Sequence, residues 1–203
     1  MQLETSRLIL RRWQDTDLEP FAQINSDDKV MEFISSKLSL DETVRMVERI
    51  EFGFDMSNLG LWALELKKTG EFIGFTGLSS PKFYTRFTPC TEVGWRIGQT
   101  HWGNGYATEA AKEVLRDGFE RLGLHEIVSF TAAGNDRSIR VMKKLQMHSN
   151  HQDDFLHPLV TKLSLKQHVL YRISITEWRQ GRILDMKSSQ GIQVFPPGYA
   201  LPV

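Results

Sequence analysis

The sequence predicts one α+β domain over about residues 1–180, and three patterns carry this prediction. Residues 61–66 and 71–78 are two apolar runs on either side of a short turn, which is typical of an antiparallel hairpin. From residue 91 onward, strand-like and helix-like patterns alternate. The chain of 203 residues is 40% hydrophobic, enough for a substantial core without disulfides or bound metal.

The first part of the chain predicts one strand and two helices. Residues 7–13 are rich in apolar side chains and favour a strand. Thr16 with Glu19, and Ser39 with Glu42, match the capping box that opens helices. The second helix should continue to about residue 56, because its apolar residues recur at helical spacing: Val44, Val47, Ile50 and Phe54.

The second part predicts strand–helix units. A strand over 91–97 leads through a glycine-bearing turn into a helix over 105–121, and a strand over 126–131 precedes a helix that begins near Asn135. Residues 167–178 return to a strand pattern. The buried side of the first helix should contain Ala107, Ala110, Ala111, Val114, Leu115 and Phe119. Prolines and the absence of charge near the end predict an irregular tail over 181–203.

Composition excludes several function classes. The 25 basic and 25 acidic side chains balance, which argues against a broad nucleic-acid-binding surface. No apolar run is long enough to cross a membrane, and the first residues do not resemble a secretion signal. Cys90 is the only cysteine, and the histidine spacing matches no known ligand set, so we expect no metal site and a cytoplasmic location.

The most informative segment is the turn before the long helix. Gly103 and Gly105 allow positive φ angles and leave backbone N–H groups open to a ligand at a helix N-terminus, where an anion is stabilised. A P-loop would need Lys and Ser or Thr after its last glycine, and Gly103 is followed by Asn104 instead. A dinucleotide fingerprint would need Gly or Ala where Thr108 stands. Of the three phosphate-binding turns compared, the one that binds acyl-CoA is left.

Four motifs, in order, resemble the GNAT superfamily of acyl-CoA-dependent N-acyltransferases, and within it the RimJ/RimL type. They lie at residues 3–11, 92–95 (Glu-Val-Gly-Trp), 102–110 (Trp-Gly-Asn-Gly-Tyr-Ala-Thr-Glu-Ala) and 135–138 (Asn-x-x-Ser). The sequence departs from the RimJ/RimL pattern at Gln146, where a glycine is usual after the last of these helices.

The resemblance implies a GNAT fold: a mixed, largely antiparallel sheet with a splayed central strand and helices on both faces. It also implies acetyl-CoA as co-substrate. The pantetheine arm would bond to the backbone near Trp95, Arg96 and Ile97, and Asn135 would contact it from the next helix. The pyrophosphate would lie on the N–H groups of Trp102, Gly103, Asn104, Gly105, Tyr106 and Ala107.

The chemistry of acetyl transfer requires a base, because an ammonium group has no lone pair with which to attack the thioester. Glu92 on the splayed strand is the first candidate, with solvated strand residue as the alternative. The leaving thiolate needs a proton donor, and Ser138 occupies the position where RimL-type enzymes use a serine; it also fits a purely structural role at a helix start. Tyr171 is the alternative hydroxyl.

We therefore expect acetyl transfer from acetyl-CoA to a primary amine by direct attack, without a covalent enzyme intermediate. The acceptor is either a protein N-terminus or a small-molecule amine, and we expect no nucleic-acid or membrane partner. A catalytically inactive CoA-binding sensor or interaction module is the alternative function. An exposed strand edge in this fold gives a place for a second copy to pair as a homodimer.

Overall fold

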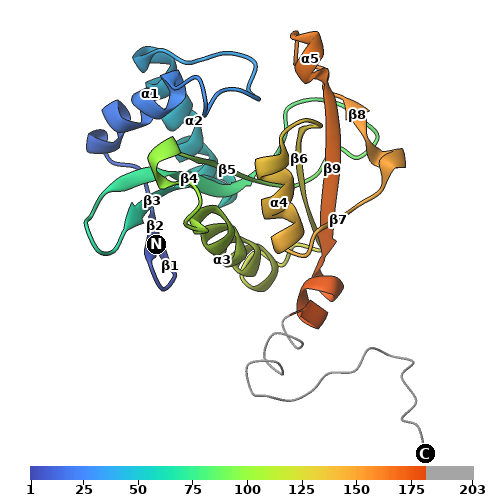
Figure 1. The fold of residues 1–203 in the computed structure, drawn as a ribbon. Coiled ribbons are helices and arrows are strands. Elements are labelled where there is room, and N and C mark those ends of the chain that lie inside the picture. The colour runs from blue at the N-terminus through green and yellow to red at the C-terminus, as the bar shows by residue number, and fades with distance from the viewer. Residues whose placement is uncertain (182–203) are drawn as a thin grey trace, which may run out of the picture.

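Residues 1–181 are described by the computed structural model, and they form a nine-stranded mixed sheet (Figure 1). Eight strands follow the order β1-β2-β3-β4-β5-β6-β9-β7, and β8 pairs with β9. Among the described strands, only the pair β5 and β6 is parallel. The strands are β1 (Leu3–Glu4), β2 (Leu8–Arg11), β3 (Leu61–Leu66), β4 (Phe72–Ser79), β5 (Glu92–Ile97), β6 (Glu126–Ala132), β7 (His148–Ser149), β8 (Phe155–Leu156) and β9 (Gln167–Ser174).

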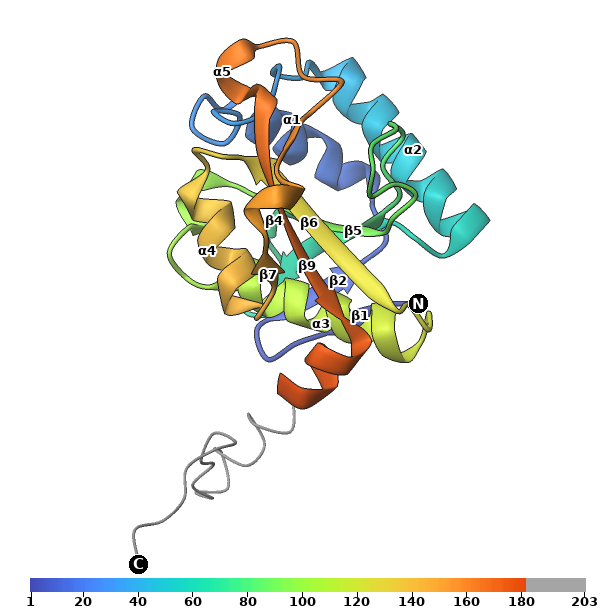
Figure 2. The same cartoon turned by 90° about the vertical axis from the view of Figure 1, so that its right-hand side faces the viewer.

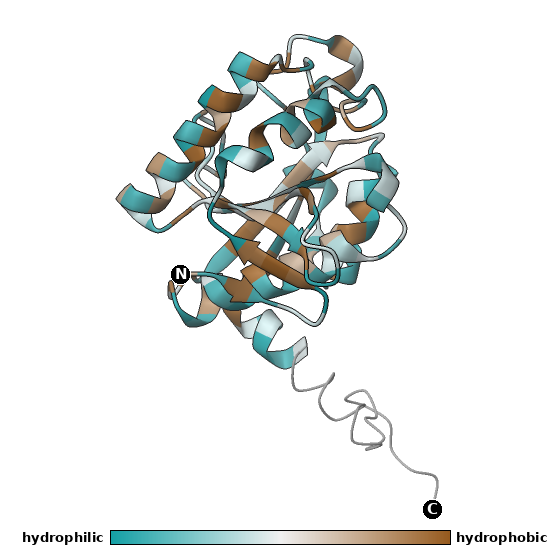
Figure 3. Cartoon of the chain, turned by 90° about the vertical axis from the view of Figure 1, so that its left-hand side faces the viewer, coloured by the Kyte–Doolittle hydropathy of each residue, from teal (hydrophilic) through white to brown (hydrophobic). Residues whose placement is uncertain are grey.

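Helices cover both faces of the sheet, as the fold prediction requires (Figures 1 and 2). The α-helices are α1 (Leu18–Ser26), α2 (Leu40–Ser57), α3 (Tyr106–Glu120), α4 (Asp136–Lys144) and α5 (Leu163–Lys166), and the 3₁₀ helices are η1 (Asp15–Asp17), η2 (Gln99–His101) and η3 (His151–Asp153). Helices α1 and α2 lie on one face, while α3 and α4 lie on the other. Hydrophobic residues concentrate on the strands between these layers (Figure 3).

The central strands separate after a single point of contact. Glu92 of β5 is in register with Val128 of β6, and the Val128 N–H donates to the Thr91 carbonyl at 2.9 Å. Beyond this pair the two strands have no common register, and β6 turns away together with β9 (Figure 1). The splay that the sequence predicts is therefore present, and it opens from Glu92 toward Ile97.

Three local predictions need correction. Thr16 does not cap a helix: it lies inside η1, and the capping box there joins Gln14 and Asp17. The box of Ser39 and Glu42 is confirmed. The last strand ends at Ser174, and residues 175–181 are helical. The first strand is limited to β2, with β1 added before it. Of the predicted tail, residues 182–203 lie outside the described residues.

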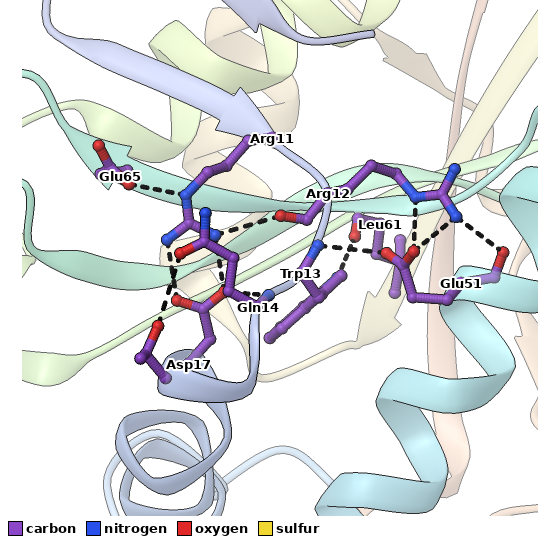
Figure 4. Close-up of polar contacts among 9 residues, drawn as sticks. Arg11, Arg12, Trp13, Gln14, Asp17, Glu51, Leu61 and Glu65 are labelled. Atoms are coloured by element: carbon purple, nitrogen blue, oxygen red, sulfur yellow. Dashed lines mark hydrogen bonds and ion pairs between the residues drawn. The ribbon is translucent and has the colours of Figure 1, made fainter.

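A polar network attaches the α1–α2 layer to the sheet (Figure 4). Arg11 of β2 donates two hydrogen bonds to the buried Asp17, at 2.7 and 2.8 Å, and one to Glu65 of β3 at 2.6 Å. Arg12 bonds to Glu51 of α2 at 2.6 Å. Because each guanidinium joins a strand to a helix or a neighbouring strand, the network sets where α1 and α2 lie above the sheet.

Candidate active site

A pocket of about 330 Å³ lies where β5 and β6 separate. Its walls come from the end of β5, the turn before α3, the α4 face and the loop between α1 and α2. Its basic side chains are His101, Arg96, Arg137, Arg140 and Lys144, and no Asp or Glu of the described chain lines it. The pocket therefore favours an anionic ligand.

The turn before α3 presents a row of free backbone N–H groups. Gly103 and Gly105 have φ angles of 80° and 81°, and a Cβ on Gly103 would meet nothing within 4 Å. The first backbone hydrogen bond of α3 runs from Glu109 N–H to Gly105 O, so the N–H groups just before it have no helical partner. The Trp102 N–H is among the predicted pyrophosphate-binding donors, but in the structure this N–H donates to Gln99 O. The free donors begin at Gly103.

Two other side chains of this segment support the turn. The Asn104 amide donates to the carbonyls of His101 and Trp102, at 3.1 and 3.3 Å, and Asn104 does not line the pocket. The Trp102 indole donates to Ile97 O at 2.8 Å, which connects the turn to the end of β5. Tyr106 and Ala107 line the pocket.

Glu109 holds the N-terminal segment against this turn. Its carboxylate accepts hydrogen bonds from Thr5 Oγ1 (2.6 Å), Ser6 Oγ (3.0 Å) and the backbone and side chain of Arg7. The Arg7 guanidinium stacks over Tyr106, 4.6 Å from the ring centroid. These contacts lower the pKa of Glu109, although partial burial opposes the effect. Glu109 thus positions a cation beside the turn.

Sequence reasoning missed the cations of α4. Arg137, Arg140 and Lys144 line the pocket, and their spacing of three and seven residues places them on one helix face. Arg137 also bonds to Glu32 at 2.7 Å and stacks over Phe33 and Trp102. A cation in the first turn of a helix opposes the helix dipole, and this was the available sequence signal.

The backbone of β5 faces the splay at alternate residues. The Thr91 carbonyl points to β6. Because backbone groups alternate between the two edges of a strand, the N–H and C=O groups of Val93, Trp95 and Ile97 point to the same edge. Past the single β5–β6 pair, Trp95 has no strand partner on that edge. Arg96 points its backbone to Phe75 of β4 instead, so only its side chain remains to bind a ligand.

Asn135 and Ser138 form a hydrogen-bonded pair at the start of α4. The Asn135 carbonyl oxygen accepts from Ser138 N–H at 3.2 Å, and its amide donates to Ser138 Oγ at 3.1 Å and Thr131 Oγ1 at 2.9 Å. Both residues line the pocket. Because Ser138 Oγ accepts a bond, its own proton is free to be donated. Tyr171 is buried in the core and does not line the pocket.

Glu92 lies at the closed end of the splay, outside the pocket described above. Burial raises the pKa of its carboxyl to about 8, and no hydrogen bond or ion pair joins it to the described part of the chain. A Cβ on Gly94 would meet only Glu92 Oε1, at 4.0 Å. The carboxyl therefore borders open space above the glycine. Burial also raises the pKa of the neighbouring Cys90 to about 11, which disfavours a thiolate nucleophile.

A family model described as an acetyltransferase (GNAT) domain matches residues 7–148. The chain belongs to the GNAT acetyltransferase family. The YkkB protein of Bacillus subtilis is 35% identical over 151 residues, 72% of this chain and 85% of its own length. The N-acetyltransferase YoaA of Bacillus subtilis is 30% identical over 145 residues, 70% of this chain and 80% of its own.

Solved structures agree on the GNAT fold. A GNAT acetyltransferase from Bacillus anthracis superposes with a TM-score of 0.72 at 24% identity, covering 87% of this chain and all of that one. The ribosomal L7/L12 α-N-protein acetyltransferase RimL, solved with CoA, has a TM-score of 0.71 at 11% identity, covering 86% and 98%. The chain is an acetyltransferase, and acetyl-CoA is the co-substrate of its family.

The described part of this GNAT acetyltransferase has neither a metal-binding cluster nor a membrane-spanning helix. Within residues 1–181, no group of three or more His, Cys, Asp or Glu side chains is arranged to hold a metal ion. None of the helices in the same range is both long and apolar enough to span a membrane.

Proposed function

We propose that this acetyltransferase moves the acetyl group of acetyl-CoA to a primary amine by direct attack within a ternary complex. The observation that carries the proposal is a continuous run of suitable groups along β5 and the turn after it. Glu92 borders open space at one end, Trp95 offers a free strand edge, and the N–H groups from Gly103 onward offer an anion site. The pocket connects the last two.

The residues present fit CoA. The N–H groups of the turn and the cations of α4 suit the phosphates, since helix N-termini and clustered positive charge both stabilise anions. The free edge at Trp95 suits the amides of the pantetheine arm, and Asn135 faces the same pocket. RimL, which shares this fold, was solved with CoA. CoA supplies the activated thioester when it is bound.

Glu92 serves as the base, directly or through one water. An alkylammonium has a pKa of about 10.4 and an ordinary Glu about 4.3, so proton transfer between them is uphill by about 6 units. With the pKa of Glu92 raised to about 8, the gap falls to about 2 units. The Trp95 N–H on the free edge polarises the thioester carbonyl. Ser138 Oγ donates its proton toward the departing thiolate.

The proposed function has two versions, which differ in the acceptor: a protein N-terminus or a small-molecule amine. The RimJ/RimL resemblance favours the protein N-terminus, and RimL is named for that activity. The test therefore uses both a panel of peptides with free N-termini and a panel of small amines as acceptors.

The experiment compares wild type with Glu92→Gln and Ser138→Ala in acetyl transfer and in calorimetric titration with acetyl-CoA. We expect kcat to fall by about 10²–10⁴-fold for Glu92→Gln, while the Kd for acetyl-CoA changes less than about threefold. Ser138→Ala should lower kcat by a smaller factor. Unchanged rates for both variants would overturn the assigned roles, and acetyl-CoA binding without turnover on either panel would favour the sensor alternative.

A further inference from the structure

Arg96 of β5 is a half-buried cation without a counter-charge, and it lies against α1. Its guanidinium stacks against Phe21 and Phe75, 6.0 and 5.4 Å from the ring centroids, and its Nη1 donates to Asn25 Oδ1. Asn25 is fully buried and donates in turn to Thr43 at 3.0 Å. No carboxylate of the described residues pairs with Arg96. Arg11, in contrast, has both Asp17 and Glu65.

The guanidinium also has unused donors. Arg96 Nε is buried and has no hydrogen-bond partner in the described structure, and no bond is found for Nη2. A buried donor without a partner costs about 1–3 kcal/mol, so such groups are uncommon unless a ligand completes them. Arg96 lines the pocket, so a ligand can reach this side chain. Burial lowers the pKa of Arg96 to about 10, and the guanidinium remains charged at neutral pH.

Glu92, Gly94 and Arg96 share one face of β5, since side chains alternate along a strand. The Cα atoms of Glu92 and Arg96 are about 13 Å apart along the strand. Between them, Gly94 leaves open space. A single face thus has a carboxyl without a partner at one end and a guanidinium without a counter-anion at the other.

We propose that the acceptor of this enzyme is a small amine that also carries a carboxylate, and that Arg96 binds the carboxylate while Glu92 faces the amine. This inference rests on the proposed function and selects the small-molecule acceptor over the protein N-terminus. The planar fork of an arginine matches a carboxylate with two hydrogen bonds. Asn25 and Thr43 are positioning residues, because they hold the guanidinium by one nitrogen and leave the others to the acceptor.

The test measures binding, so it does not depend on turnover. The CoA-loaded protein is titrated calorimetrically with pairs of amines that differ by one carboxylate: lysine and cadaverine, ornithine and putrescine, phenylalanine and phenethylamine. We expect at least one carboxylate-bearing member to bind about tenfold or more tightly than its partner. In Arg96→Gln the ratio should fall to within about twofold. The ratio within a pair is the readout, so a general loss of affinity does not affect it.

A second variant keeps the Arg96 guanidinium and guards against misfolding of Arg96→Gln. Asn25→Asp places a carboxylate against Arg96 and supplies the missing counter-anion. We expect this variant to fold at least as stably as wild type and to lose the preference for the carboxylate. Gln23→Glu, which adds one negative charge at an exposed position of the same helix, is the matched control and should retain the preference.

Three results would overturn the inference: equal binding within every pair, a preference that survives in both Arg96→Gln and Asn25→Asp, or no binding of any carboxylate-bearing amine. Acetylation assays on the same compounds separate this failure from failure of the proposed function. Turnover with equal rates for both members of each pair would leave acetyl transfer standing and remove the role of Arg96.

Discussion

At the scale of single residues, Glu92 and Arg96 differ from charged groups such as Asp17 and Glu109, because neither is paired with an opposite charge in the described chain. Asp17 and Glu109 each accept several hydrogen bonds, and their charges serve to hold segments together. Glu92 and Arg96 have no opposite charge within the described residues. Both positions cost stability at neutral pH, because Arg96 keeps a charge without a counter-charge and Glu92 holds a proton that the unfolded chain would release.

The ionisation of Glu92 predicts how stability depends on pH. Its pKa is about 8 in the folded chain and about 4.5 when exposed. Between these pH values the folded state keeps a proton that the unfolded state has lost, so the free energy of unfolding falls as pH rises. Glu92→Gln removes this pH dependence, because glutamine does not ionise. We therefore expect the free energy of unfolding of the variant to rise relative to that of wild type between pH 5 and pH 8, by roughly 1–3 kcal/mol at pH 8.

Urea unfolding at the two pH values measures this gain. Glu48→Gln, at an exposed position of α2, is the matched control and should show no pH-dependent difference from wild type. A constant difference between Glu92→Gln and wild type across this range would mean that the carboxyl is solvated in the folded chain.

At the scale of elements, the turn before α3 joins strand β5 to the helix and carries the predicted phosphate site. Gly105 has a φ of 81°, and its space is bounded by Arg7 Nη2, 3.7 Å from an added Cβ. We expect Gly105→Val to raise the Kd for acetyl-CoA by about tenfold or more, because a β-branched residue disfavours this φ and displaces the free N–H groups.

Gly70→Val is the control for that prediction. Gly70 has a similar φ of 71° in the hairpin turn between β3 and β4, also with open space around it, and it does not line the pocket. Both variants should lose about 1–3 kcal/mol of stability, and only Gly105→Val should lose affinity in calorimetric titration. Equal losses of affinity would attribute the effect to general strain.

The end of α4 shows how an element keeps its geometry without the expected residue. Gln146 stands where the RimJ/RimL pattern has glycine, and it adopts the left-handed conformation with a φ of 61°. Its side chain lies beside Gly181, where a Cβ would come within 2.0 Å of Gln146 Oε1. Backbone hydrogen bonds from Gln146 N–H to Lys143 O (3.0 Å) and from Met147 N–H to Met142 O (3.1 Å) close this helix end, so the left-handed cap forms without glycine.

At the scale of the whole molecule, the two helical layers contribute different parts of the candidate site. The α3–α4 layer provides the turn and the cations that we propose for CoA, and residues of α1, in the second layer, contact Arg96. The position of the second layer depends on the network around Arg11 and Asp17 (Figure 4). The edge strands of the described sheet, β1, β7 and β8, have two residues each, which limits strand pairing with a second copy. Homodimer formation stays a prediction.

Asp17→Asn tests this dependence. Asp17 is 1% exposed and receives both Nη groups of Arg11, so we expect a loss of about 2–4 kcal/mol in urea unfolding. Hydrogen exchange should increase in α1 and remain near wild type in α3. The control, Glu113→Gln, removes a surface ion pair with Arg116 and should cost under about 1 kcal/mol. An equal increase of hydrogen exchange in both layers would contradict the prediction that the Arg11–Asp17 network positions only the α1–α2 layer.

The sequence alone determined the order of strands and helices from the hairpin to α4 and the confirmed capping box at Ser39, and it predicted an anion site at Gly103 and Gly105, which stays a proposal. These features depend on local backbone preferences and on hydrophobic periodicity, which a short window of sequence contains. The family motifs added the splay and the candidates Glu92 and Ser138. Thr16 shows the limit of local reasoning, because a better-placed pair, Gln14 and Asp17, formed the box instead.

Only the tertiary structure decided which of those residues face one another. It brought the cations of α4 to the pocket, placed Tyr171 in the core and left Arg96 without a counter-charge on the same face as Glu92. Each of these facts compares groups that are distant in the sequence, such as Arg96 with Asn25 or Arg137 with Glu32. Whether a charge is paired depends on which elements pack around it, and that is set by the sheet topology.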